Sequence, residues 1–369
     1  MEVQLTPAIK VAATVIETDP ARDVAVLWLD PTVVAAVRPV PLDCAQTTRP
    51  AVVNGQDLFA IGAPLRGDTR MAFGSVSNVE ARATAADLRL AAGSGGGPVF
   101  TADGRVIGIT AVEDGNASNR LAGSRVVRVD QACEVVAAAE KKLTAAMPPV
   151  GTHLPVEPVG PFPVDRLEQI VKGRVGSLNP YQMASSDFDV AFITPVHTYG
   201  AQYMAEQTRG RERGSGSRAP DSGPATRPLM DFGNWSDYVG DFPPVLLVRV
   251  TPKMVENFWT TVGRAAARTQ GMALPPVKRV KTGFSRLRAF CGDSEVTPIH
   301  PFTLERRVSE RAFLYEGLYV FDRDALGPTC PSVTLVLYSE KEPAKGDTRV
   351  VDGTLVQQVW NDFEGYRSK

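Results

Sequence analysis

Residues 91–100, AAGSGGGPVF, place a single serine, Ser94, inside a run of glycines. Glycine adopts backbone conformations that a side chain resists, so such a turn can aim several backbone N–H groups at one substrate oxygen. Amides arranged in this way stabilise an oxyanion, and a serine hydroxyl beside them attacks a carbonyl once a base removes its proton. The stretch therefore suggests a nucleophile turn and raises the question of whether Ser94 or Gly95 holds the attacking position.

The segments around this turn indicate an all-β domain. Short apolar runs recur between Gly, Pro, Asn and Asp residues, a pattern typical of a barrel or sandwich: KVAATVIE, VAVLWL, DLFAIG and RVIGITAV. The period changes at residues 126–143, where Val135, Ala139 and Leu143 recur at helical spacing. A helix is therefore predicted to close this domain.

A proline-rich segment at residues 146–165 removes backbone donors and favours an extended chain, which predicts a linker. We place a first domain at 1–145 and a β-rich α+β domain at 166–369. Amphipathic helices are predicted there in DRLEQIVKGRV and in TPKMVENFWTTVGRAAART, the latter with Thr251 as N-cap and Pro252 at the first helical position. Residues 206–228 contain few apolar residues and predict a flexible loop.

Composition narrows the class of protein. The 369 residues carry 40 basic and 41 acidic side chains, which gives no electrostatic reason to expect nucleic acid as a partner. No apolar run approaches the roughly 18 residues of a membrane helix, and no export signal is visible at the start. The four cysteines lack metal-binding spacing, so no metal or other cofactor is predicted, and Cys291–Cys330 is the one disulfide we expect.

Three stretches, in order and spacing, resemble the trypsin-like peptidases, most closely their HtrA-like branch, over about residues 9–143. TDPARDVAVLWLD resembles the strand that carries the triad aspartate and assigns that role to Asp23. DLFAIGAPLRGDTRMAFGSVSNVE resembles the family's glycine-proline turn and the strand after it, and DLRLAAGSGGGPVFTADGRVIGI resembles the nucleophile loop and the following hairpin. The resemblance implies a double β-barrel, here with an incomplete first barrel, and serine endopeptidase activity.

The resemblance also implies the surroundings of such a protein. Its substrate would be peptide or unfolded protein, its location outside the cytoplasm, and self-association into an oligomer would be compatible with the family. The C-terminal domain resembles no family that we recognise.

Two departures from the family pattern argue against catalysis. The pattern G-x-S-G-G-P falls on residues 93–98, which puts the nucleophile position on Gly95, and a glycine has no atom that can attack. The family's histidine lies tens of residues before the aspartate, yet only 22 residues precede Asp23. The histidines present lie in the linker and second domain: His153, His197 and His300. We expect an impaired or inactive enzyme, and a natural protein that extends upstream of Met1.

An alternative alignment keeps the enzyme active. If Gly97 is an insertion, Ser94 becomes the nucleophile, served by a histidine from upstream sequence. Otherwise Ser94 is only the small polar residue that precedes the nucleophile position.

Further positions follow from the resemblance. The amides of Gly93 and Gly95 would form the oxyanion hole. Other residues would contact substrate, through a specificity pocket and through a strand that pairs with bound peptide: Arg89, Leu90, Ala91, Ser124, Arg125 and Val126. Because backbone pairing asks little of side chains, a third possibility is a peptide-binding pseudoprotease. Each of two residues also has a purely structural interpretation. Asp23 would then only accept local backbone hydrogen bonds, and Arg89 would be a solvated surface residue.

Overall fold

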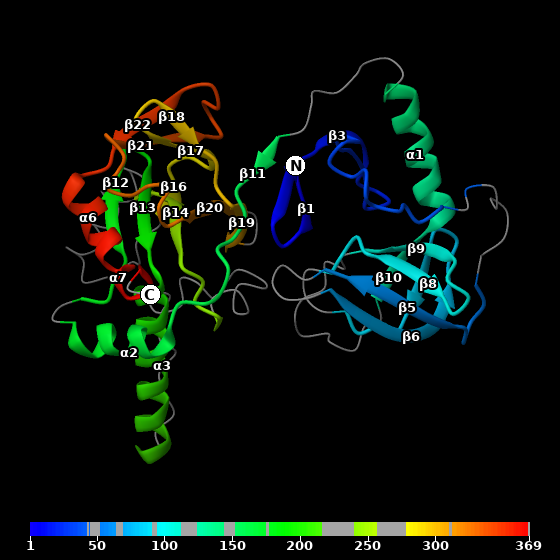
Figure 1. The fold of residues 1–369 in the computed structure, drawn as a ribbon, viewed down its shortest axis with the longest axis horizontal. Coiled ribbons are helices and arrows are strands. Elements are labelled where there is room, and N and C mark those ends of the chain that lie inside the picture. Colours follow the sequence, from blue (N-terminus) through cyan, green and yellow to red (C-terminus); the bar gives the residue numbers. More distant parts are fainter. Residues whose placement is uncertain are drawn as a thin grey trace, which may run out of the picture. The chain divides into compact units, whose positions relative to one another are not determined.

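The structure is a computed structural model, shown in Figure 1. It describes residues 1–42, 44, 52–63, 69–90, 94–111, 124–143, 152–174, 177–215, 240–256, 278–309 and 312–367. The chain folds as two compact units that divide after Leu154. This division lies inside the predicted linker, while the domain limits 1–145 and 166–369 stay a prediction.

In its described residues, the first part of the N-terminal unit forms two small antiparallel sheets and no closed barrel. Strands β1 (Glu2–Thr6), β2 (Ile9–Ala12) and β11 (His153–Leu154) pair in the order β1-β2-β11. Strand β3 (Thr14–Asp19) pairs with β4 (Val24–Trp28). The prediction of an incomplete first barrel is confirmed.

The rest of the unit is a closed six-stranded barrel in the order β10-β7-β6-β5-β8-β9. Its strands are β5 (Asp57–Gly62), β6 (Arg70–Val79), β7 (Ala83–Ala86), β8 (Pro98–Thr101), β9 (Val106–Thr110) and β10 (Ser124–Arg128). The strands alternate between the two faces, so Leu58 and Ala60 of β5 are buried while Asp57 is exposed. The apolar side chains inside form one core: Val52, Leu58, Ala60, Val76, Ala86, Leu88, Val99, Ile107 and Val126.

Helix α1 (Val129–Leu143) directly follows the barrel and contacts β3, β4 and β9, which confirms the predicted closing helix. Its buried face includes Val135 and Ala139. A disulfide joins Cys133 of this helix to Cys44, with 5.5 Å between the Cα atoms. Sequence analysis missed this pair, because residues 89 positions apart are brought together only by the tertiary fold.

The C-terminal unit contains two larger sheets. One has the order β12-β13-β14-β20-β19, the other β18-β17-β21-β22, and β15 pairs with β16. The strands are β12 (Tyr181–Ala184), β13 (Phe188–Ile193), β14 (Val245–Pro252), β15 (Met254–Glu256), β16 (Lys278–Val280), β17 (Phe284–Cys291), β18 (Ser294–Val296), β19 (His300–Ser309), β20 (Ala312–Asp322), β21 (Val333–Ser339) and β22 (Gly346–Val350). The expected disulfide between Cys291 and Cys330 is present.

Four helices accompany these sheets in the described part of the unit: α2 (Val164–Gly173), α3 (Pro195–Ser215), α6 (Gly353–Asn361) and α7 (Glu364–Arg367). Helix α2 confirms the helix predicted in DRLEQIVKGRV. Asp352 caps α6, its side chain accepting hydrogen bonds from the backbone N–H groups of Thr354 and Leu355.

Two sequence predictions for this unit were wrong. Thr251 and Pro252 do not begin a helix but end strand β14, where Thr251 pairs with Asp189 and Pro252 with Phe188. Pairing with a neighbouring strand outweighs the local helix-start signal, and a proline is tolerated at the strand's end. The remainder of that predicted helix, from residue 257 on, lies outside the described residues.

The predicted flexible loop 206–228 is helical over its first part, because α3 continues to Ser215. Glutamate, glutamine and arginine are good helix formers, so a helix already started at Pro195 extends through them without apolar residues. Residues 216–228 lie outside the described residues.

Candidate functional site

The glycine-rich turn is held by one residue of a neighbouring strand, Thr110 at the end of β9. The Thr110 hydroxyl donates to the Ser94 carbonyl at 3.0 Å and accepts from the Gly97 N–H at 3.1 Å. In the backbone, Gly96 N donates to Thr110 O at 2.6 Å, and Thr110 N donates to Gly97 O at 2.9 Å. Thr110 is 2% exposed, so these contacts are shielded from water.

Two of the glycines are required by the fold itself. Gly96 has a φ of +82°, a conformation that side chains resist. A Cβ on Gly97 would lie 2.2 Å from the backbone oxygen of Ile61 in β5, a distance that no real contact allows. The shape of the turn therefore depends on Gly96 and Gly97 whether or not it carries a nucleophile.

Ser94 and Gly95 differ in their surroundings. Ser94 is 3% exposed, and its side chain lies against β5, where a Cβ on Gly62 would be 2.4 Å from the Ser94 Oγ. Within the described residues this Oγ is buried and has no hydrogen-bond partner. Gly95 is exposed at the turn. Of these two candidate nucleophile positions, Gly95 is therefore the one that faces solvent.

Asp23 lies in the turn between β3 and β4, where it is exposed and has a φ of 57°, unusual for a residue with a side chain. Its neighbour Arg22 secures the turn to α1 through an ion pair with Glu134 and a hydrogen bond from Nε to Gln131 at 3.1 Å. Arg22 also pairs with Asp19, and their hydrogen bond lowers the pKa of the Asp19 carboxyl. The contacts of this turn run to α1, while those of the Ser94 turn run to β5 and β9.

The residues before the nucleophile turn are partly described. Arg89 is exposed, and Leu90 is half-buried against the barrel core. Ala91 and Gly93 lie outside the described residues, so the specificity-pocket and oxyanion-hole roles assigned to them stay predictions.

The strand predicted to pair with peptide, β10, is paired with β9, the strand whose Thr110 holds the turn. Val126 is fully buried and already pairs with Thr84 of β7 and with Thr110 of β9. The Arg125 carbonyl accepts from Ala111 N at 2.9 Å, and the Ser124 hydroxyl donates to Leu88 O at 2.7 Å. Because β10 is enclosed between two strands at Val126, the peptide-pairing role assigned to that residue does not fit the barrel.

Sequence reasoning missed the contribution of Thr110. The signal was present in the hairpin of β8 and β9, which reverses around Gly104 and pairs Pro98 with Ile109. This register puts Thr110 opposite Gly97, so a count of residues across the hairpin would have found it.

Comparison with known families agrees with these observations. Residues 2–109 match the model of the trypsin-like peptidase domain. The N-terminal unit carries a trypsin-like peptidase domain. The matched residues of this peptidase domain include strands β1 to β4, the Asp23 turn and the Ser94 turn. No curated protein matches the chain.

Several solved structures are similar to part of the chain. Deg5 is 22% identical, with a TM-score of 0.27, over 34% of this chain and 59% of its own. A serine endoprotease from Yersinia pestis is 20% identical, with a TM-score of 0.30, over 36% and 45%. The HtrA-type protease AlgW, determined with a decapeptide, is 20% identical, with a TM-score of 0.31, over 36% and 41%. The matches thus span about half the length of these proteases.

The described part of the chain contains no candidate bilayer-spanning helix and no candidate metal-ion cluster. Among its helices, α3 included, none combines the length and apolarity that a bilayer-spanning helix requires. The described histidine, cysteine, aspartate and glutamate side chains form no group of three that could hold a metal ion.

Proposed function

We propose that this chain derives from trypsin-like serine endopeptidases and binds peptide or unfolded protein without cleaving it. The observation that carries the proposal is the contrast between Ser94, buried against Gly62, and Gly95, exposed at the turn. This contrast supports the alignment that puts Gly95 at the nucleophile position. A glycine there keeps the turn but supplies no attacking atom.

The buried position of Ser94 argues against its use as an alternative nucleophile. Attack requires the hydroxyl to reach both a substrate carbonyl and a base. The Ser94 hydroxyl faces β5, and its carbonyl is bonded to Thr110. Bringing the hydroxyl to the surface would require the turn to rearrange around Thr110.

Peptide binding requires backbone hydrogen-bond donors in the turn, whereas catalysis also requires a nucleophile. No hydrogen bond in the described part of the chain uses the Gly95 N–H, so this donor is available to a carbonyl oxygen of a bound peptide. Since both backbone groups of Thr110 are already bonded to the turn, we place such a peptide beside the exposed Gly95 itself. A location outside the cytoplasm and self-association stay predictions from the resemblance.

Fluorophosphonate labelling with peptide mass spectrometry tests the proposal, alongside binding and cleavage of fluorescein-labelled casein, an unstructured protein. We expect saturable binding of casein by fluorescence anisotropy, no cleavage, and no adduct on Ser94. The matched variants are Ser94→Ala, which removes the alternative nucleophile, and Gly95→Ser, which restores the family's residue.

An adduct on Ser94 that disappears in Ser94→Ala would overturn the proposal and identify an active serine protease. The absence of casein binding by folded protein would contradict the binding role in particular.

A further inference from the structure

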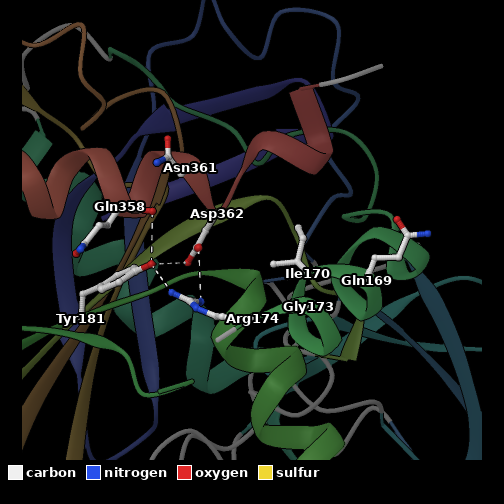
Figure 2. Close-up of a pocket in the computed structure, with 8 residues that line it drawn as sticks. All are labelled: Gln169, Ile170, Gly173, Arg174, Tyr181, Gln358, Asn361 and Asp362. Atoms are coloured by element: carbon white, nitrogen blue, oxygen red, sulfur yellow. Dashed lines mark hydrogen bonds and ion pairs between the residues drawn. The ribbon is translucent and has the colours of Figure 1, made fainter. Parts of the chain in front are cut away.

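The C-terminal unit contains a pocket of about 450 Å³ that no sequence motif predicted. It lies where the C-terminal ends of α2 and α6 meet strand β12 (Figure 2). Most of its lining residues carry polar groups, and they come from three separate parts of the chain: Gln169, Ile170, Gly173, Arg174, Tyr181, Gln358, Asn361 and Asp362. Convergent polar groups in a concave site are the usual mark of a small-molecule or peptide-group site.

A network of hydrogen bonds orients the pocket's central groups. The Asp362 Oδ2 accepts from Thr194 Oγ1 at 2.7 Å and from the Tyr181 hydroxyl at 3.2 Å. The Arg174 Nη2 donates to the Tyr181 hydroxyl at 2.6 Å, as the dashed lines in Figure 2 show. Asp362 and Arg174 are thus held in place by groups that need no ligand.

Behind the pocket, the network ends on a buried neutral histidine. His197 is 2% exposed, and its Nδ1 accepts from the backbone N–H of Thr194 at 3.1 Å. Burial, helped by the charge of Arg174, lowers the pKa of His197 to about 3. A ring that accepts at Nδ1 and stays uncharged fixes Thr194, and through it Asp362, in one arrangement.

Within this network, one donor and one acceptor face each other in a long ion pair that lacks a hydrogen bond. The Arg174 Nη1 lies 3.6 Å from the Asp362 Oδ1, too far for a hydrogen bond. Among the described residues, Nη1 has no hydrogen-bond partner, and no hydrogen bond reaches Oδ1. An ion pair this long leaves hydrogen-bonding capacity on both groups, which a ligand that pairs with both would use.

The charge of the pocket selects the kind of ligand. The charges of Arg174 and Asp362 cancel, and the other polar side chains are neutral: the hydroxyl of Tyr181 and the amides of Gln169, Gln358 and Asn361. A ligand with one full charge would therefore leave one partner unbalanced at low dielectric. A neutral group that carries an acceptor next to a donor matches both sites.

We propose that this pocket binds a carboxamide group, whose oxygen accepts from Arg174 and whose N–H donates to Asp362. Such a group occurs in asparagine and glutamine side chains and in the peptide bond itself. Because the pocket belongs to the C-terminal unit, its test does not depend on the function proposed for the peptidase domain.

Saturation-transfer NMR titrations on the full chain test the proposal with four small probes. Acetamide represents a side-chain amide, N-methylacetamide a peptide bond, glycine a zwitterion and acetate a simple anion. We expect saturable binding of one or both amides and none of acetate or glycine. The preferred amide then identifies the source of the group.

Two variants locate the binding. Asp362→Asn replaces one carboxylate oxygen with an N–H₂ group and removes the negative charge, and we expect amide affinity to fall at least about tenfold. Glu364→Gln makes the same chemical change on the exposed first residue of α7, outside the pocket, and is expected to bind as the unmodified chain does. If Asp362→Asn does not fold, Arg174→Lys, which keeps the charge but loses the fork of donors, is expected to show the same loss.

The proposal is overturned if neither amide binds saturably, if glycine or acetate binds in preference, or if the folded pocket variant binds amide as tightly as Glu364→Gln does.

Discussion

The glycine-rich turn of the N-terminal unit and the polar pocket of the C-terminal unit are opposite kinds of site. The turn follows a recognisable sequence pattern, and its backbone is held by Thr110, but a glycine occupies its exposed position. The pocket follows no pattern, yet Asp362, Tyr181 and Arg174 converge in it. The sequence pattern of the turn therefore predicted its local backbone conformation. The groups available for chemistry depend instead on which side chains the fold brings together.

The largest expected effect on the free energy of unfolding distinguishes Gly97, which the fold requires, from Gly95, which it does not. Gly97→Ala puts a Cβ against the backbone oxygen of Ile61, and we expect a loss of about 3 kcal/mol in the free energy of unfolding. Gly95→Ala, at an exposed position, is expected to change it by less than about 0.5 kcal/mol. Urea unfolding of the two variants measures both values, and equal effects would contradict this account of the turn.

Thr110 offers a second measure of how the turn is held. Thr110→Val removes the hydroxyl that bonds both Ser94 and Gly97 and leaves those buried groups unpaired. We expect a loss of about 2 kcal/mol. Thr110→Ser keeps the hydroxyl and serves as the control. A valine variant as stable as the serine variant would show that the hydroxyl does not hold the turn.

The network behind the pocket predicts a pH dependence. The pKa of His197 is about 3 in the folded protein against 6.5 for an ordinary histidine, so between these values the unfolded chain binds more protons. Stability is therefore expected to fall as the pH drops below 6.5, by about 2 kcal/mol between pH 7 and pH 5. Burial raises the pKa of the neighbouring Asp362, which acts in the opposite direction at the acid end.

Hydrogen exchange of α6, measured across this pH range, reports the effect in the C-terminal unit. In His197→Asn the side-chain oxygen can accept from Thr194 N as Nδ1 does, and this variant is expected to lose the dependence of stability on pH. His153→Asn changes an exposed histidine and is expected to keep that pH dependence unchanged. If the pH dependence of stability persists in His197→Asn, it arises from another titrating group.

The smallest expected effect concerns Ser94. Its hydroxyl is buried without a partner in the described part of the chain, so Ser94→Ala is expected to raise the free energy of unfolding by about 1 kcal/mol. Thermal unfolding measures the change. A marked loss of stability would instead reveal a structural role for the hydroxyl.

Much of the N-terminal fold was predictable because its signals are local. The short apolar runs that form β5 and β9 and the helical period of α1 are visible in short windows, and the structure agrees with each. The strand at Thr251 was mistaken for a helix because a cap signal is also local, while the pairing that decides the matter comes from β13, some sixty positions away.

The sequence by itself determined the barrel strands, the closing helix and the glycines of the turn, because side-chain period and backbone freedom belong to single residues and their neighbours. Only the tertiary structure decided that Ser94 faces inward and that Thr110 of β9 holds the turn. It alone brought Asp362 to Thr194 and Tyr181, across more than 160 positions of chain. Burial, charge balance and unmet hydrogen bonds are properties of such assembled groups, and they exist only once distant segments have packed together.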